Sequence, residues 1–163
     1  MAERLPFRSG IGYDSHRFAP GGPLMLGGVE IAVDVHLHGH SDGDAIAHAV
    51  TDAVLGAAAL GDIGSMFPDT DPTNAGRDSI EMLILAVGHV EAVGWRVGQV
   101  DVVVITETPR IAPYRAAMRE RLADALRCAA EDVGIKGKTN EGMGFVGRGE
   151  GLACLATATL YRA

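Results

Sequence analysis

The chain has 163 residues, of which 47% are hydrophobic, and its formal net charge at pH 7 is −7. We expect a single domain over residues 1–163, because this length is enough to bury a substantial core. The negative net charge argues against nucleic acid or an anionic membrane surface as the main partner. If the substrate is anionic, local cations must hold it, and metal ions are the simplest choice.

The sequence shows no sign of export or membrane insertion. No apolar run approaches the length of a membrane span, and the opening residues MAERLPFRSG lack the pattern of a signal peptide, so we expect a cytoplasmic protein. The two cysteines, Cys128 and Cys154, each lie in an apolar segment. We expect buried, reduced thiols without a catalytic role.

The first predicted element is a strand over residues 9–18, SGIGYDSHRF, in which Asp14 and His16 share one face. Residues 19–28 form a turn and a short extended piece, which continues through residues 29–33 as a hairpin. The histidines His36, His38 and His40 follow at alternate positions.

The stretch HSDGDAIAHAVTDAVLGAAALGDIG, residues 40–64, predicts an amphipathic helix. Its apolar face consists of Ile46, Ala49, Val50, Ala53, Val54 and Ala57. Asp44, His48 and Asp52 stand four residues apart and form a polar stripe. His40 and Ser41 precede the helix start, where free backbone N–H groups and the helix dipole attract phosphate.

A loop rich in Gly, Asp and Pro follows over residues 61–78, with at most a short helical turn. A second helix begins near Asp78, with Glu81 completing a capping-box pattern, and ends at Gly94. Its expected buried residues are Ile80, Leu83, Ile84 and Val87.

The second half of the chain predicts a buried strand over residues 99–105, a helix opened by Pro113, and strands over residues 135–140 and 152–161. The helix should bury Met118, Leu122, Ala125, Leu126 and Ala129 and expose Arg115, Arg119 and Arg127. The glycine-rich loop GMGFVGRGEG before the last strand has no dinucleotide-binding context, and its pattern favours a flexible hairpin tip.

This order of elements predicts an α+β fold, a two-layer α/β sandwich in which helices cover one face of a mixed sheet. The other face then needs cover. Small apolar residues on both faces of the last strand suggest self-association.

A metal site can be built from Asp14, His16 and His48. A strand places residues two apart on one face, and a neighbouring helix can add a third ligand, which leaves a fourth position open for substrate. Zinc suits these ligands, although manganese or cobalt also fit, and Asp44 or Asp52 could orient the imidazole. The residues equally allow Asp14 to be a turn cap and His48 a surface residue. A rival metal site consists of His36, His38 and His40, which are closer together in sequence but lack a second element to supply a further ligand.

Lys138, Thr139, Asn140 and Glu141 offer a cation, a hydroxyl and a carboxylate at a strand end. Glu141 could hold a hard divalent ion such as Mg²⁺ between phosphates. The alternative is a surface charge cluster.

Four segments together resemble the 2-C-methyl-D-erythritol 2,4-cyclodiphosphate synthase family over nearly the whole chain: GYDSHRF, HSDGDAIAHAVTDAVLGAAALGDIG, FPDTDP and GFVGRGEG. The resemblance implies a homotrimer with a chorismate-mutase-like or ferredoxin-like arrangement and active sites at subunit interfaces. It also implies Zn²⁺ on Asp14, His16 and His48, and Mg²⁺ or Mn²⁺ held by Glu141.

The resemblance assigns His40 and Thr139 as transition-state stabilisers. Asp62–Gly64 resembles the ribose-contacting turn, residues 67–71 the substrate loop and residues 106–112 the cytidine-binding loop, while Phe145 and Arg148 match residues near the substrate and the trimer axis. The implied substrate contacts are Asp14, Ser15, His16, His40, Ser41, Asp62, Ile63, Gly64, Phe67, Pro68, Asp69, Thr70, Asp71, Thr106, Glu107, Thr108, Pro109, Arg110, Ile111, Ala112, Lys138, Thr139, Asn140, Glu141, Phe145 and Arg148.

Two segments depart from the family pattern. The family often has consecutive threonines before the metal-holding glutamate, where this chain has Lys138, Thr139 and Asn140, so a hydroxyl contact at position 138 is lost. Glu107 and Arg110 lie in a loop that varies in the family.

The implied reaction converts 4-diphosphocytidyl-2-C-methyl-D-erythritol 2-phosphate to the 2,4-cyclodiphosphate and releases CMP, as part of non-mevalonate isoprenoid biosynthesis. A metal-dependent phosphohydrolase with the same ligands and a non-catalytic trimeric nucleotide sensor are the alternatives.

Overall fold

A five-stranded mixed sheet organises the computed structural model, which describes residues 5–162. The strands are β1 (Phe7–Pro20), β4 (Val35–Leu37), β5 (Trp95–Ile105), β6 (Val133–Lys138) and β7 (Gly151–Arg162), in the order β4-β1-β7-β5-β6. The β5–β6 pair is parallel and the other three pairs are antiparallel. A separate hairpin joins β2 (Leu24–Leu26) to β3 (Val29–Ile31).

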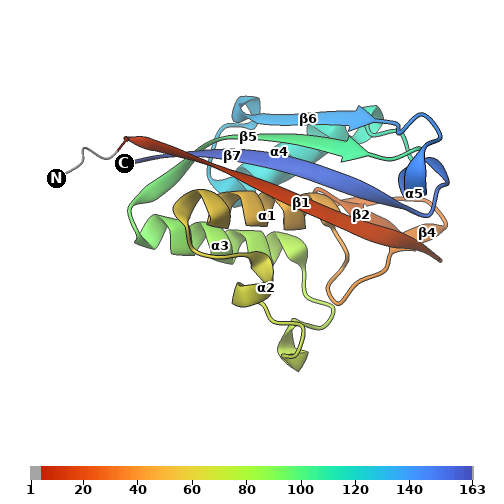
Figure 1. Cartoon of the computed structure of the whole chain (residues 1–163), viewed down its shortest axis with the longest axis horizontal. Coiled ribbons are helices and arrows are strands. Elements are labelled where there is room, and N and C mark those ends of the chain that lie inside the picture. Colours follow the sequence, from red (N-terminus) through yellow and green to blue (C-terminus); the bar gives the residue numbers. More distant parts are fainter. Residues whose placement is uncertain (1–4, 163) are drawn as a thin grey trace.

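Helices lie on one face of this sheet (Figure 1). The three long ones are α1 (Ala45–Ala58), α3 (Ser79–Ala92) and α4 (Arg115–Leu126). Helix α1 packs directly on β1 and β7, α3 lies beside α1, and α4 packs against β6. The short helices are α2 (Ile63–Met66), α5 (Gly144–Gly147) and the 3₁₀ turns Pro72–Asn74, Ala112–Tyr114 and Ala130–Asp132. The predicted mixed α/β fold is therefore confirmed.

Two glycines of β1 set the distance between strand and helix. A Cβ atom added at Gly12 would lie 1.8 Å from the carbonyl oxygen of Ala49, and one added at Gly10 would lie 2.2 Å from that of Ala53. Such contacts are sterically impossible, so only glycine allows the backbone of α1 to approach this closely. The predicted apolar face of α1 is fully buried in the resulting core.

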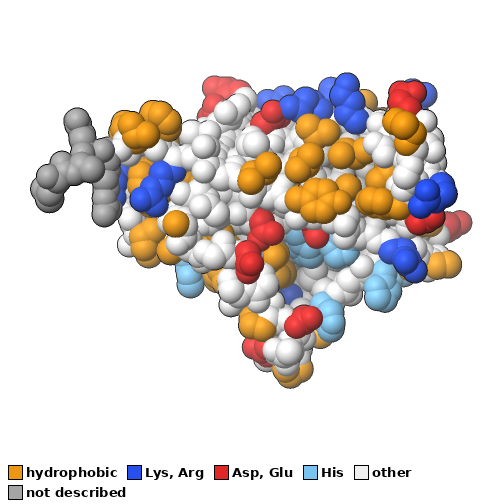
Figure 2. Space-filling view, viewed as in Figure 1, with side chains coloured by type: hydrophobic (Ala, Val, Ile, Leu, Met, Phe, Trp, Pro, Cys, Tyr) orange, Lys and Arg blue, Asp and Glu red, His pale blue; other side chains and the backbone are white. Residues whose placement is uncertain are grey.

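The opposite face of the sheet is open. From Phe7 to Phe18 the odd-numbered residues of β1 are exposed and the even-numbered ones face the helices. Ile11 is 68% exposed and Tyr13 is 54% exposed, and Leu155 of β7 lies on the same face. Figure 2 shows hydrophobic side chains gathered over the sheet.

Several predictions about the helices were wrong in detail. Ile84 is 41% exposed, because the buried stripe of α3 runs through Leu83 and Val87 instead. Helix α4 ends at Leu126, where Arg127 adopts a left-handed conformation, so Ala129 lies outside it and is exposed. Pro113 lies in the 3₁₀ turn before α4.

Arg119 is not simply a solvated side chain. Its guanidinium donates hydrogen bonds to the carbonyl oxygens of Ala130 and Val133, which joins α4 to the start of β6. The segment after β6 is not a hairpin tip either, because β5 separates β6 from β7 and the connection contains α5.

The two cysteines are free thiols. Cys154 is buried, as expected, and Cys128 is half-buried. Burial raises the pKa of both thiols, which favours their protonated form. Separately, none of the helices within residues 5–162 combines the length and apolar character needed to cross a membrane.

Candidate metal centre and substrate pocket

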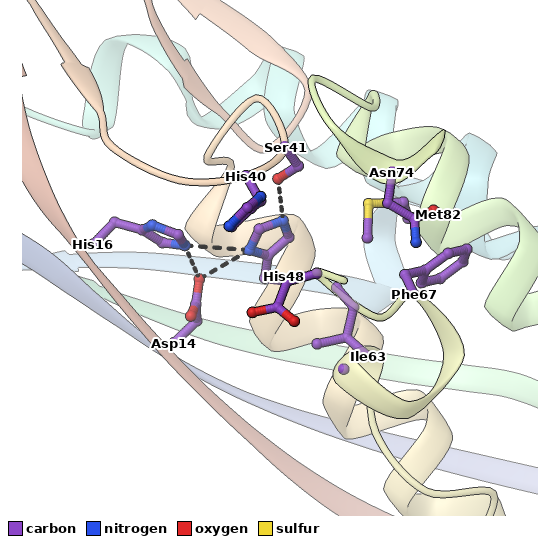
Figure 3. Close-up of a pocket in the computed structure, with 11 residues that line it drawn as sticks. Asp14, His16, His40, Ser41, His48, Ile63, Phe67, Asn74 and Met82 are labelled. Carbon is purple, nitrogen blue, oxygen red and sulfur yellow. Dashed lines mark hydrogen bonds and ion pairs between the residues drawn. The ribbon is translucent and has the colours of Figure 1, made fainter. Parts of the chain in front are cut away.

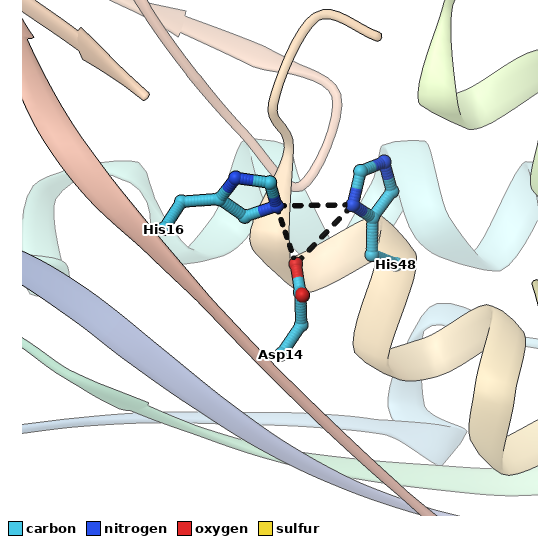
Figure 4. Close-up of side chains that lie close together, drawn as sticks. All are labelled: Asp14, His16 and His48. Atoms are coloured by element: carbon cyan, nitrogen blue, oxygen red, sulfur yellow. Dashed lines mark hydrogen bonds and ion pairs between the residues drawn. The ribbon is translucent and has the colours of Figure 1, made fainter. Parts of the chain in front are cut away.

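Three potential ligand atoms meet between β1 and α1 (Figure 4). Oδ2 of Asp14 lies 2.8 Å from Nε2 of His16 and 3.2 Å from Nδ1 of His48, and the two nitrogens are 3.3 Å apart. Within residues 5–162 this is the one group of three or more His, Cys, Asp or Glu residues whose ligand atoms gather this closely. The predicted three-residue cluster is confirmed, and the rival set His36, His38 and His40 does not form one.

The local structure explains this meeting. Asp14 and His16 are alternate residues of β1 that both face the helices, and His48 lies in the first turn of α1. The contacts at Gly10 and Gly12 bring that turn against the strand. The three side chains are half-buried, so their polar ends open to solvent on one side.

The geometry fits a tetrahedral divalent ion. Metal–ligand distances of about 2.0–2.1 Å separate tetrahedral ligand atoms by roughly 3.3 Å, which is close to the spacing of these three atoms. Two imidazole nitrogens and one carboxylate oxygen suit zinc and leave a fourth position for an external ligand.

In both histidines, the ring nitrogen that faces away from the cluster also has a hydrogen-bond partner. Nδ1 of His16 lies 2.8 Å from the carbonyl oxygen of His38, an acceptor that requires a proton on Nδ1 and leaves Nε2 free to bind a metal. Nε2 of His48 lies 2.9 Å from the hydroxyl oxygens of both Ser41 and Ser79.

The carboxylate and the imidazole beside it shift each other's pKa. Burial alone would raise the pKa of Asp14, but hydrogen bonds from His16 and then His48 outweigh it and lower that pKa. Burial alone would lower the pKa of His16, but its hydrogen bond to Asp14 outweighs it and raises that pKa. In the metal-free protein the pair therefore favours carboxylate with imidazolium.

The expectation that Asp44 or Asp52 orients the imidazole of His48 was wrong. Asp44 is completely buried and caps α1, and its carboxylate accepts hydrogen bonds from the backbone N–H groups of Ala47, Gly27 and Gly28. Burial raises its pKa despite these donors. Asp52 accepts a hydrogen bond from the N–H of Ile63 and so positions α2.

A hollow of about 200 Å³ opens beside the cluster (Figure 3). Figure 2 shows histidine side chains recessed in it, beneath the sheet. Its lining includes Asp14, His16, His40, Ser41, His48, Ile63, Gly64, Phe67, Asp69, Asn74 and Met82. Most of these residues come from the predicted set, and the last two were missed.

The residues of the predicted ribose-contacting turn and substrate loop that do not line the pocket help to shape it. Asp62 caps α2 through the N–H of Ser65, a bond that lowers its pKa, and Asp71 accepts from the N–H of Thr73 in the next turn. Asn74 donates to the carbonyl oxygen of Pro68, which closes the loop. Thr70 is exposed outside the pocket lining.

A second hollow, of about 310 Å³, lies beyond the ends of β5 and β6. It is lined by Thr106, Glu107, Pro109, Arg110, Ile111, Ala112, Arg115, Gly137, Lys138 and Thr139. Thr108 and Asn140 support it, because Thr106 donates its hydroxyl to the Thr108 carbonyl oxygen and the Asn140 N–H donates to Glu107. The predicted cytidine-binding loop and the Lys138–Glu141 segment thus lie together.

Glu107 holds the turn that presents Glu141. Its carboxylate accepts hydrogen bonds from the N–H groups of Asn140, at 2.9 Å, and Gly142, at 3.4 Å. Glu141 between them has a left-handed backbone, with φ of 51°, and its side chain is exposed. Glu107 is therefore engaged with its own chain.

The two hollows are far apart within one chain. From β1 to β6 there are three strand intervals, which amount to roughly 14 Å. The structure therefore does not bring Thr139 and Glu141 to the cluster of Asp14, His16 and His48 in the same subunit.

A third hollow, of about 260 Å³, lies at the other side of His16; the predicted residues Ser15 and Phe145 line it, whereas the predicted Arg148 lies outside its lining. Ser15, Arg17, Phe145 and Glu150 surround it, and Arg148 forms an ion pair of 2.6 Å with Glu150.

Comparison with known proteins places these features in a family. The sequence profile of the YgbB family matches residues 7–161. A curated relative from Gemmatimonas aurantiaca, named 2-C-methyl-D-erythritol 2,4-cyclodiphosphate synthase, is 63% identical over 156 residues, which cover 96% of this chain and 94% of the relative.

Solved structures agree. The bifunctional IspDF of Campylobacter jejuni superposes with a TM-score of 0.93 at 38% identity, over 96% of this chain and 42% of that longer protein. The IspF of Plasmodium falciparum in complex with CDP superposes with a TM-score of 0.85 at 31% identity, over 98% of this chain and 99% of that one. The chain therefore belongs to the YgbB family and is a homologue of the 2-C-methyl-D-erythritol 2,4-cyclodiphosphate synthases.

Proposed function

We propose that this protein is a cyclodiphosphate synthase, which converts 4-diphosphocytidyl-2-C-methyl-D-erythritol 2-phosphate to 2-C-methyl-D-erythritol 2,4-cyclodiphosphate and CMP. The observation that carries the proposal is the cluster of Asp14, His16 and His48, whose ligand atoms open into a pocket. The name of the Gemmatimonas relative supports the same reaction.

The reaction is an intramolecular phosphoryl transfer. An oxygen of the 2-phosphate forms a bond to the β-phosphorus, and the bond from the β-phosphorus to the oxygen it shares with the α-phosphate breaks. The electron pair leaves with CMP. Both reacting groups are anionic, so the main obstacles are repulsion and alignment, and the protein needs no nucleophile or general base of its own.

The residues that would hold metals lie in the first hollow and on the turn beside the second. Asp14, His16 and His48 would bind Zn²⁺, and Glu141 would hold Mg²⁺ or Mn²⁺. When bound, such ions supply positive charge that neutralises phosphate oxygens and stabilises the departing CMP.

The chain's own polar groups orient the phosphates. His40 and Ser41 line the pocket at the entry to α1, where the helix dipole favours an anion. We propose that His40 and Thr139 donate hydrogen bonds to oxygens of the phosphorus under attack. Alignment of two groups on one substrate can lower the barrier by roughly 7–11 kcal/mol.

We further propose a homotrimer in which each active site is shared by two subunits. The distance of roughly 14 Å between β1 and β6 supports this, because Thr139 and Glu141 could reach a metal cluster only in a neighbouring copy. The cytidine would then bind in the hollow at Thr106–Ala112 of that copy. The open sheet face with Ile11, Tyr13 and Leu155 supplies an apolar surface for such assembly. The cytoplasmic location expected from the sequence stays a prediction.

Phosphorus NMR of the products tests the function. The purified protein with the cytidine diphosphate substrate and Mg²⁺ should give CMP and a cyclic diphosphate, and removal of zinc should stop the reaction. An open diphosphate or monophosphate would instead show a phosphohydrolase. Tight binding of unchanged CDP, independent of zinc content, would show a nucleotide sensor.

A further inference from the structure

The hydroxyl of Ser79 lies between the imidazole of His48 and the carboxylate of Asp42. Its oxygen is 2.9 Å from Nε2 of His48 and donates to Oδ1 of Asp42. Ser79 begins α3, is completely buried, and lies 31 residues from His48 along the chain. Neither Ser79 nor Asp42 belongs to the predicted site.

Asp42 is held in place by several donors. Its carboxylate also accepts hydrogen bonds from the backbone N–H groups of Asp44, at 3.0 Å, and Ser79, at 3.2 Å. The backbone N–H of Asp42 in turn donates to the carbonyl oxygen of Arg77. Asp42 therefore links the N-terminus of α1 to the N-terminus of α3 through these hydrogen bonds.

Counting protons along this chain of contacts assigns the tautomer of His48. An ionised carboxylate only accepts, so Asp42 takes the single O–H proton of Ser79. The Ser79 oxygen then presents lone pairs to Nε2 of His48, which must carry the ring proton. A neutral imidazole with its proton on Nε2 has its lone pair on Nδ1, so with a metal at this centre Nδ1 would bind the metal in place of its hydrogen bond to Oδ2 of Asp14, which lies 3.2 Å away.

We propose that Ser79, fixed by Asp42, is a positioning residue that sets the tautomer and ring orientation of His48 for metal binding. The inference rests on the proposed metal at this centre. It parallels the contact of His16, whose Nδ1 faces the carbonyl oxygen of His38. Ser41 also lies 2.9 Å from Nε2, but it has no carboxylate partner among residues 5–162 and lines the substrate pocket.

The first test is the zinc dissociation constant, measured by competition with a chromogenic chelator. Ser79→Ala should weaken zinc binding by about 10–100-fold, which is the usual cost of removing a partner behind a metal ligand. Ser79→Thr, which keeps the hydroxyl, should restore the affinity to near that of the unaltered protein. The matched control is Thr51→Val, which removes a buried hydroxyl one turn along α1 that bonds only the Ala47 carbonyl oxygen. It should leave the zinc affinity unchanged.

The second test reads the tautomer directly and needs no variant. Long-range ¹H–¹⁵N spectra of the zinc-loaded, unaltered protein should show His48 protonated on Nε2 and bound to metal through Nδ1. A proton on Nδ1, metal on Nε2, or a folded Ser79→Ala protein that binds zinc as tightly as the unaltered one would overturn the proposal. Product analysis of the unaltered enzyme tests the proposed reaction separately, so the two can fail independently.

Discussion

The metal centre and the hollow beyond β5 and β6 are built on different principles. At the metal centre, three ligand atoms from β1 and α1 stand 2.8–3.3 Å apart, held by backbone packing and by partners behind each imidazole. At the other hollow, Lys138 and Glu141 are exposed; Lys138 is the last residue of β6, and Glu141 lies on the turn that Glu107 supports. The proposed zinc ligands therefore sit on a strand and a helix, whereas Glu141, the proposed holder of the second ion, sits on a loop.

Removal of a metal ligand should produce the largest effect. His48→Ala should lose zinc and lower cyclisation by about 10³-fold or more, since metal assistance is worth several kcal/mol, and the protein should stay folded. Zinc content and product formation measure this. His89→Ala, on an exposed position of α3, is the control and should behave like the unaltered protein. Full activity of zinc-free His48→Ala would contradict the proposed mechanism.

A change in packing should damage the same centre without touching a ligand. In Gly12→Ala the new methyl group meets the Ala49 carbonyl oxygen, so α1 must move away from β1. We expect a stability loss of about 3 kcal/mol together with weaker zinc binding. Thermal denaturation and metal titration measure both.

The control for this packing change is Gly88→Ala. A Cβ atom at this position of α3 meets nothing within 4 Å. The substitution should raise stability by up to about 1 kcal/mol, because alanine favours a helix. If Gly12→Ala left both stability and zinc affinity intact, the strand–helix contact would not be what positions His48.

A substitution at Glu141, beside the second hollow, should distinguish binding of the second divalent ion from binding of zinc at the metal centre. Glu141→Gln should reduce activity by about 10–100-fold at low Mg²⁺, through loss of about 1.5–3 kcal/mol of charge-assisted interaction. Zinc content should not change. Mg²⁺ titration of the rate, paired with zinc analysis, measures the difference. Loss of zinc in Glu141→Gln would show that the two regions are not independent.

The smallest effect is a dependence on pH that should reverse when zinc is added. The raised pKa of His16 stabilises the metal-free fold fully below its ordinary value of 6.5, and this contribution is lost as pH rises through the raised value. The lowered pKa of Asp14 stabilises the metal-free fold at pH values above 3.8, the ordinary pKa of this group. This contribution is lost as the pH falls through the lowered pKa. The pair therefore contributes most between pH 3.8 and 6.5.

Zinc should invert this trend, because a proton on His16 competes with the metal. The melting temperature of the zinc-free protein relative to His16→Gln should fall from pH 6 to pH 9, whereas the stabilisation by added zinc should grow over the same range. Parallel melting curves for the two proteins at every pH would show that His16 does not titrate as described.

Periodicity and spacing predicted the elements that build the metal centre. The buried stripe of α1 and the shared face of Asp14 and His16 follow from helical and strand repeats, so their positions could be read from the sequence. Ser79 could not be found in this way, because its contact with His48 depends on how α3 packs beside α1. Ile84 failed for a related reason, because an apolar residue near the edge of a helical stripe is buried only if a neighbouring element covers it. Ala129 failed because α4 ends at Leu126, before reaching it.

The arrangement of the two hollows was also beyond sequence reasoning. The resemblance implied active sites at subunit interfaces, but it did not say which residues of one chain would lie apart; the strand order separates Thr139 and Glu141 from the zinc ligands within the chain. Strand order depends on crossovers between distant segments, which local patterns do not specify.

The buried carboxylate of Asp44 has a consequence for how the molecule opens. Its carboxylate bonds the N–H groups of Gly27 and Gly28 in the β2–β3 hairpin as well as that of Ala47 in α1, so detachment of the hairpin would remove two of the three donors from a buried charge at the start of the helix that carries His48. These amides should therefore exchange with deuterium as one cooperative unit. A bound ion that holds His48 in place would then slow the exchange of amides that it never touches.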